Sequence, residues 1–207
     1  MASTIIHMCV ANELNKKLKR NNKEILLGSV APDISKIVGE NKIKSHFENN
    51  DYSINLDKFL NKYKKQLDND FLMGYYIHLY TDKLWAENFT SNLISNDCVK
   101  LLDGTQIILN KEELFYYIYN DYTNMNLSLI DFYNLDLSLF YEDVLIPNIE
   151  MDEIPINKLQ LLIDKAGIII ENSKEEKKYI FDMYSVKDFI SSCVNIIYKD
   201  IEKQGFI

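Results

Sequence analysis

The stretch DFLMGYYIHLYTDKLWAENFTSNLI, residues 70–94, carries the strongest helical pattern in the chain. Apolar and aromatic side chains recur along it at spacings of three and four, which predicts a helix with one buried face. That face comprises Phe71, Tyr75, His78, Leu79, Asp82, Trp85, Ala86 and Phe89. Because residues i and i+4 leave a helix on the same side, the His78 imidazole and the Asp82 carboxylate should meet within it.

Amphipathic patterns on either side of this stretch predict further helices. We expect them at residues 3–20, 55–67, 111–121, 127–140, 156–170 and 185–203, with Ser3 and Ser185 as N-caps. Residues 103–109 indicate a turn and a short strand. Gly28 and Pro32 predict an ordered loop over residues 28–33 that ends at Asp33. The sequence therefore predicts an all-α fold, a single-domain helical bundle spanning residues 1–207.

Composition limits the classes of function. The chain has 207 residues, a net charge of −8 and 47% hydrophobic residues, which suits one domain with a sizeable core. The excess of acidic residues argues against long nucleic acid as a partner, because its phosphates are also negatively charged. The first residues lack the basic and apolar regions of a secretory signal, and no window is apolar enough for a membrane span. We therefore expect a cytoplasmic protein; the sequence carries no signal for an oligomeric state.

The cysteines Cys9, Cys98 and Cys193 lie far apart in the sequence, so they show none of the spacings of a thiolate metal site. Cys9 and Cys193 fall within apolar helical patterns and are expected in the core. The simplest interpretation is a protein with reduced thiols.

The chain has only three histidines, His7, His46 and His78. Each has an ordinary explanation: a core histidine, an exposed loop histidine, and a histidine hydrogen-bonded to Asp82. Asp33 could likewise cap a helical turn. Taken together, however, several ionisable groups in apolar or constrained settings are costly to bury unless a cation compensates them. Nitrogen and oxygen donors without a thiolate suit Zn²⁺ or another divalent ion, and five of them suffice for one or two ions.

The order of these residues resembles the zinc-dependent phospholipase C family. The motifs are TIIH at residues 4–7, GSVAPD at 28–33, SHF at 45–47 and GYYIHLYTD at 74–82. The single-strand-specific zinc nucleases share that all-α fold and the same early order of ligands. The resemblance covers roughly residues 3–90, so the metal-site motifs fall within residues 1–90 and residues 91–207 form a less recognisable helical remainder.

The resemblance implies a role for each of the five residues. Asp33, His46, His78 and Asp82 would surround one zinc ion, and Asp82 would bridge to a second ion held by His7. Asp33 would also be the catalytic base that orients the attacking water. The implied activity is that of a phosphoric ester hydrolase in which metal-activated water attacks a phosphodiester. The expected substrate is a small phosphate ester or a phospholipid head group.

Departures from the family keep other functions open. No histidine follows His78, so the third metal cluster of the three-zinc enzymes cannot form in its usual way. Glu87, Asp97 or Asp103 could replace it. The alternatives are a nuclease or nucleotidase on the same fold, and a catalytically inactive helical protein that a metal stabilises.

Aromatic residues near the predicted site allow two interpretations. Tyr75 and Trp85 flank the His78–Asp82 pair and could form the wall of a substrate pocket, although their helical spacing favours core packing. The tyrosine-rich stretch at residues 116–141 could line a cleft for a lipid or a base, and packing between helices explains it equally well.

Overall fold

The computed structural model describes residues 1–95 and 98–206. Its α-helices are α1 Thr4–Leu18, α2 Asn22–Val30, α3 Ile34–Val38, α4 Lys42–Ser45, α5 Leu56–Tyr63, α6 Asp70–Leu84, α7 Lys111–Thr123, α8 Asn126–Tyr133, α9 Leu159–Glu171 and α10 Met183–Lys203. Three short strands, β1 Ile94–Ser95, β2 Cys98–Lys100 and β3 Gln106–Ile108, form an antiparallel sheet in that order. The predicted all-α class is therefore confirmed, with this small sheet as its only β-structure among the described residues apart from an isolated bridge.

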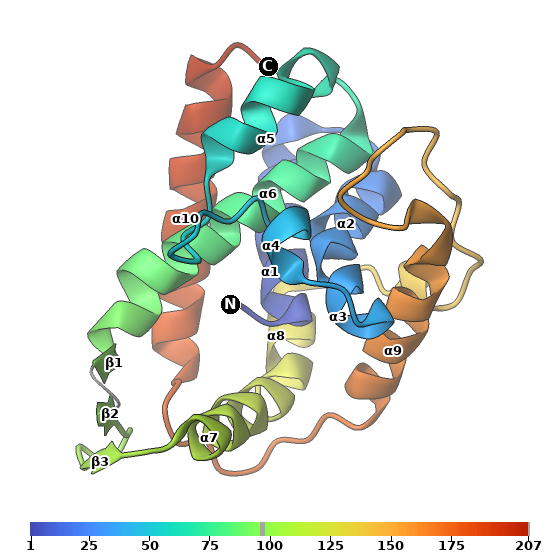
Figure 1. The fold of residues 1–207 in the computed structure, drawn as a ribbon. Helices are drawn as coiled ribbons and strands as arrows, with labels where there is room; N and C mark the ends of the chain where they lie inside the picture. The colour runs from blue at the N-terminus through green and yellow to red at the C-terminus, as the bar shows by residue number, and fades with distance from the viewer. Residues whose placement is uncertain (96–97, 207) are drawn as a thin grey trace.

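Helix α1 lies inside the fold, against α2, α6, α8 and α10. The chain begins near the centre of the molecule, and the strands lie at one edge beyond the end of α6 (Figure 1). As predicted, the side chain of Ser3 caps α1 by accepting a hydrogen bond from the backbone N–H of Ile6. One hydrophobic cluster includes residues from Ala2 to Ile201, so helices from both ends of the chain share a core.

Helix α6 buries the face that its periodicity predicts, from Phe71 to Trp85. After Leu84 the helix continues as a π-helical turn, Trp85–Phe89. Because such a turn holds more residues than an α-helical turn, it rotates the following side chains relative to the predicted face. Ala86 is consequently exposed, and its predicted place on the buried face is wrong.

Glycines allow α2 and α6 to pack at very short range. A Cβ atom on Gly28 would lie 2.0 Å from the carbonyl oxygen of Phe71, and one on Gly74 would lie 2.2 Å from that of Ile25. The predicted loop over residues 28–33 is therefore wrong. Helix α2 continues to Val30 and a 3-10 turn follows at Ala31–Asp33, because Gly28 serves close packing rather than a change of chain direction.

The last helix begins earlier than the sequence predicts. Asp182, not Ser185, is the N-cap of α10, and its carboxylate accepts hydrogen bonds from both the backbone N–H and the hydroxyl of Ser185. Ser185 thus lies inside the first turn. Aspartate and serine are both common N-cap residues, so the sequence of residues 182–185 alone does not show which of the two caps the helix.

Cys9 and Cys193 are buried, as expected for core cysteines, and no disulfide joins the three thiols. Burial raises the pKa of the Cys193 thiol to about 12. No helix among the described residues combines the length and the hydropathy needed to cross a membrane.

Candidate metal centre

Four separate segments bring the five predicted ligands together. His7 comes from α1, Asp33 ends the 3-10 turn after α2, and His46 follows α4 as its C-cap residue. His78 and Asp82 lie one turn apart on α6. Each of the five residues is at most 7% exposed. The structure therefore assembles all five residues in one buried cluster, which we call the His–Asp cluster.

The two histidines His46 and His78 point their Nε2 atoms at each other. The distance between these atoms is 3.3 Å. On the other side of its ring, His78 Nδ1 lies 2.8 Å from the carbonyl oxygen of Ser29, which can only accept a hydrogen bond. Nδ1 of His78 therefore carries the proton, and in the neutral ring Nε2 presents a lone pair to the cluster.

His46 has the same arrangement with a different partner. Its Nδ1 lies 2.9 Å from the hydroxyl oxygen of Ser45, and that hydroxyl has its own acceptors in Ser35 Oγ and the carbonyl oxygen of Lys42. If Nδ1 donates to Ser45, the Nε2 lone pair of His46 also faces the cluster. Two lone pairs at this distance repel each other unless a cation or a proton lies between them.

Both carboxylates point toward the same space. Asp82 Oδ2 lies 3.6 Å from His78 Nε2 and 3.7 Å from His46 Nε2. Asp33 Oδ1 lies 3.6 Å from His46 Nε2. These distances exceed those of good hydrogen bonds, so the oxygens surround the two nitrogen atoms without being satisfied by them.

His7 completes the cluster from α1. Its ring stacks on that of His78, with centroids 3.8 Å apart and planes inclined by 12°. His7 Nε2 lies 3.3 Å from Asp82 Oδ1, an oxygen that also accepts a hydrogen bond of 2.7 Å from the backbone N–H of Ala2. Asp82 thus contacts ring nitrogens on both sides of the cluster, the position expected for a shared ligand.

Several polar atoms of the cluster lack hydrogen-bond partners, as expected for residues that bind a metal ion. Within the described part of the chain, His7 Nδ1 and Nε2 and Asp82 Oδ2 are buried without a hydrogen bond of acceptable geometry. Leaving such groups unpaired is costly. Ligand atoms of His7, Asp33 and His78 lie within 4.8 Å of one another, as do those of His46, His78 and Asp82. The residues could therefore hold a divalent ion in either group.

Burial and mutual interaction set the protonation states. Burial lowers the pKa of His7 to about 4, with a further lowering from His78. It also lowers the pKa of His46. Burial alone would raise the pKa of Asp82, but the nearby His7 outweighs it and the pKa falls well below its ordinary value. Neutral imidazoles and ionised carboxylates are the forms that bind a metal ion.

A cavity of about 560 Å³ opens beside the cluster, and we call it the Asp33 cavity. Of the five cluster residues, Asp33 alone lines it; Met1, Ala2 and Ser3 form the adjoining wall. Helices α7 and α9 provide an apolar wall that includes Phe115, Ile118, Tyr119, Tyr122, Ile169 and Ile170. Part of the tyrosine-rich stretch at residues 116–141 therefore lines a cavity, while Tyr133 in the same stretch is buried.

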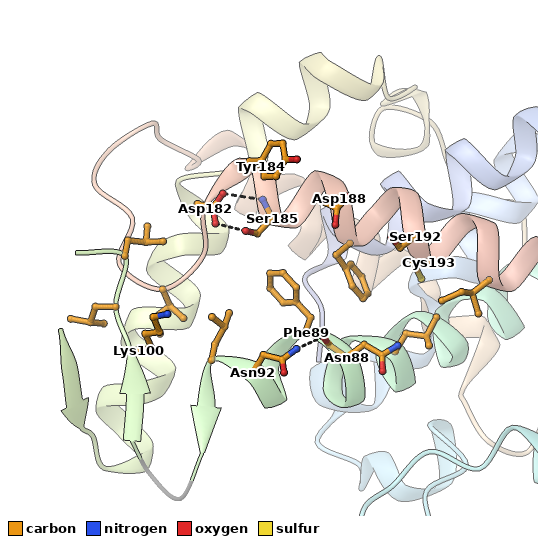
Figure 2. A pocket seen from close by; sticks show the side chains of 17 residues that line it. Asn88, Phe89, Asn92, Lys100, Asp182, Tyr184, Ser185, Asp188, Ser192 and Cys193 are labelled. Carbon is orange, nitrogen blue, oxygen red and sulfur yellow. Dashed lines mark hydrogen bonds between the residues drawn. The ribbon is translucent and has the colours of Figure 1, made fainter. Parts of the chain in front are cut away.

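A second cavity, of about 570 Å³, lies between the π-helical turn, the small sheet and α10 (Figure 2). Phe89 and Phe189 lie within it with ring centroids 5.4 Å apart, and Lys100 lines the side formed by β2. None of the five cluster residues lines this cavity, so it is separate from the candidate metal centre.

Tyr75 and Trp85, the predicted pocket residues, are completely buried. Tyr75 stacks on Phe59 and donates a hydrogen bond to the carbonyl oxygen of Ser45, the residue before His46. Trp85 packs against aromatic side chains including Phe189. Both thus lie in the core, the alternative that helical spacing favours, and neither lines the Asp33 cavity.

The possible replacements for a third metal cluster lie elsewhere. Glu87 is exposed and pairs with Lys83 one turn earlier on the helix. Asp103 is exposed and accepts a hydrogen bond from the backbone N–H of Thr105. Asp97 lies outside the described residues.

Sequence reasoning missed three residues that support the cluster. Lys36 places Nζ 2.7 Å from Asp33 Oδ1, while Ser29 and Ser45 hold the rings of His78 and His46. The spacing of Lys36, three residues after Asp33, is a signal for such a pair on a helical turn. The Ser29 contact uses a backbone carbonyl and leaves no trace in residue identity.

Comparison with known proteins adds no relative. No protein-family model matches the chain, and searches of curated proteins and of solved structures find no match.

Proposed function

We propose that the protein is a metal-dependent phosphoric ester hydrolase, with zinc as the preferred ion and the His–Asp cluster as its centre. The observation that carries this proposal is the 3.3 Å approach of His46 Nε2 and His78 Nε2, flanked by two carboxylates and enclosed in the core. A bound cation would compensate the two facing nitrogen lone pairs and the carboxylates around them. The order of the ligands, similar to that of the zinc-dependent phospholipase C family, supports phosphate esters as substrates.

In this proposal a bound zinc ion supplies a Lewis acid for the phosphoryl oxygens and lowers the pKa of the attacking water. The chain's own residues do the rest. Asp33 faces the cavity as a carboxylate, because the neighbouring His46 and the charge of Lys36 outweigh burial and lower its pKa. The ionised carboxylate can orient the water, and in this proposal it also accepts the proton of that water. Ser29 and Ser45 fix the two rings so that their Nε2 atoms stay aimed at the centre.

Metal analysis combined with an ester panel tests the proposal. The purified protein is expected to contain one or two divalent ions per chain by elemental analysis. Zinc-loaded protein should hydrolyse 4-nitrophenyl phosphate or bis(4-nitrophenyl) phosphate, and chelation should abolish the hydrolysis. A 3′-nucleotide in the same panel tests the nucleotidase alternative on this fold. Loaded protein that hydrolyses none of the panel contradicts the proposed activity.

One observation favours a second candidate, a metal ion with a structural role only. Four of the five cluster residues are at most 1% exposed, and Asp33 is the single member that lines the cavity. An ion held in this way would link α1, α4 and α6 whether or not substrate can reach it. If chelation lowers the melting temperature while the ester panel shows no turnover, this candidate replaces the hydrolase.

A further inference from the structure

More basic than acidic side chains line the Asp33 cavity, although the whole molecule is acidic. The chain carries 31 acidic and 23 basic residues. Among the described residues that line the cavity, Lys36 and Lys42 carry ammonium groups and Asp33 carries the single carboxylate. Asp33 and Glu48 offset these two charges by ion pairing, but the groups exposed to the cavity are mainly ammonium donors, which points to an anionic ligand.

Lys36 stands where the cavity meets the cluster. It lies one turn after Asp33 on α3, its Nζ is 2.7 Å from Asp33 Oδ1, and its side chain is 36% exposed. The ammonium is thus anchored at one end while part of the side chain remains open to the cavity. A lysine placed in this way presents a compact charge that suits a phosphoryl oxygen.

Lys42 provides a second ammonium group at the Asp33 cavity. Its Nζ lies 2.5 Å from Oε1 of Glu48, a residue that is buried and does not line the cavity. Glu48 therefore fixes the position of the Lys42 ammonium from the side away from the cavity. A quaternary ammonium head group entering this cavity would face two lysines, with no carboxylate other than Asp33 to compensate its charge.

The far wall offers an apolar surface. Phe115, Tyr119 and Ile169 are each between 42% and 58% exposed at residues that line the cavity, and Ile118 and Ile170 lie beside them. A ligand with its charge at Lys36 would place an apolar or aromatic group along α7 and α9. Ligand sites commonly combine such apolar walls with a few polar groups that fix orientation.

We propose that the Asp33 cavity binds the phosphomonoester dianion of an apolar or aromatic alcohol, and that Lys36 determines the preference for this dianion over a choline ester. The inference rests on the proposed hydrolase function. Hydrolysis would break the ester P–O bond and form a P–O bond from water. Asp33 would take the proton of the water and return it to the departing alcohol, so that the products are the alcohol and inorganic phosphate.

Two matched chromogenic substrates test the preference. Zinc-loaded protein should hydrolyse 4-nitrophenyl phosphate with a kcat/KM at least about tenfold higher than that for 4-nitrophenylphosphocholine, since a single charge-assisted contact is worth this much. Both esters release the same nitrophenolate, so the comparison isolates the head group. A preference for the choline ester overturns the proposal.

Lys36→Gln tests the residue. We expect it to raise the KM for the monoester, lower the substrate ratio by about tenfold, and leave the metal content unchanged. Lys36→Arg, which keeps the charge, should restore much of the ratio. Lys100→Gln is the control, because it removes the same charge from the second cavity (Figure 2). An unchanged ratio in Lys36→Gln overturns the proposal.

Binding of inorganic phosphate, measured by isothermal titration calorimetry, separates this proposal from the hydrolase function. The wild-type protein and Lys100→Gln should bind phosphate, and Lys36→Gln should bind it at least about tenfold more weakly. If neither ester is hydrolysed but phosphate binding still depends on Lys36, the hydrolase function fails and the anion site stands. If hydrolysis occurs but phosphate binding ignores Lys36, the hydrolase function stands and the present inference fails.

Discussion

Gly28 of α2 and Gly74 of α6 lie backbone against backbone, so that a Cβ atom on either one would be 3.0 Å from the Cα atom of the other. The next residue after Gly28 is Ser29, whose carbonyl oxygen accepts the hydrogen bond from Nδ1 of His78, one turn after Gly74. The contact between two residues without side chains therefore sets the distance at which the ring of His78 is held. The close packing of α2 against α6 therefore also fixes the orientation of His78, a candidate metal ligand.

Gly74→Ala should disturb both the packing of α2 against α6 and the position of His78. The new Cβ atom would lie 2.2 Å from the carbonyl oxygen of Ile25, so the helices must separate. We expect a loss of about 3 kcal/mol in the free energy of unfolding, measured by urea denaturation, together with weaker zinc binding. Gly167→Ala is the control: nothing lies within 4 Å of its Cβ position, and alanine should stabilise α9 by up to about 1 kcal/mol. Equal effects of the two substitutions would contradict this account.

His78→Ala removes the ring that both candidate ligand groups share. We expect the metal content, measured by elemental analysis after purification, to fall to background. Asp82→Asn retains the size of the side chain and should lower the metal content with less disturbance of the fold. Asp164→Asn changes an exposed acid on α9 and should leave the metal content at its wild-type value. Unchanged metal content in His78→Ala would sink the assignment of the site.

Metal should stabilise the folded protein. An ion that binds only the native state contributes about 2.7 kcal/mol when its free concentration is a hundred times its dissociation constant. For a chain of this length that corresponds to a rise of roughly 5–10 °C in the melting temperature. Differential scanning fluorimetry of chelated and zinc-loaded protein measures it. Asp82→Asn should lose most of the rise; the same rise in this variant would place the binding site elsewhere.

Asp121 stabilises the segment that leads into α10. The carboxylate is fully buried and accepts hydrogen bonds from the backbone N–H groups of Tyr179, Ile180 and Phe181. Asp121→Ala leaves these donors without their acceptor, and we expect a loss of about 3 kcal/mol in the free energy of unfolding. Asp131→Ala, at an exposed position of α8, should change it little. Urea denaturation of both variants at neutral pH provides the comparison.

Asp182 gives a pH-dependent contribution to stability. Burial alone would raise its pKa, but hydrogen bonds from the Ser185 hydroxyl and backbone outweigh burial and lower the pKa. A lowered folded-state pKa means that the carboxylate stabilises the fold above the unfolded value of about 3.9, and that this stabilisation is lost as the pH falls toward the folded value. Asp182→Ala should therefore cost about 1 kcal/mol at pH 7 and progressively less below about pH 4.

The control for this pH dependence is Asp188→Ala, at an exposed position further along the same helix. Its stability relative to the wild type should stay constant over the same range of pH. A cost of Asp182→Ala that persists undiminished to pH 2.5 would show that the cap does not depend on the charge.

The α6 helix and the His78–Asp82 pair on it could be predicted because their signals are local. Apolar spacing identifies the buried face, and the four-residue separation of His78 and Asp82 places both on it. The stacking of His7 on His78 depends on how α1 packs against α6. The periodicity of one helix carries no information about this packing. That His7, Asp33 and His46 join the His78–Asp82 pair was expected from the similarity in ligand order to a known family, and the stacking was not predicted.

Glycine and serine caused the local errors for an identifiable reason. Gly28 looks the same in a sequence whether it turns the chain or allows two helices to approach, and the structure uses it for the second purpose. Ser185 and Asp182 are both good N-caps, so only the geometry of the first turn distinguishes them. The sequence indicated that residues 116–141 could line a cleft, but the Asp33 cavity as a whole could not be predicted, because its walls come from the first 42 residues and from residues 115–170.

The enclosure of the His–Asp cluster also determines how fast an ion could be exchanged. Asp82 accepts a hydrogen bond from the backbone N–H of Ala2, and the carbonyl oxygen of Met1 accepts one from the hydroxyl of Tyr122. Residues 1–3 therefore cover the cluster beside Asp33, on the side next to the cavity. An ion bound beneath this segment, on the side away from Asp33, would leave only when the segment detaches. Release to a chelator should then be slow and nearly independent of chelator concentration, with a rate set by local opening of the first residues.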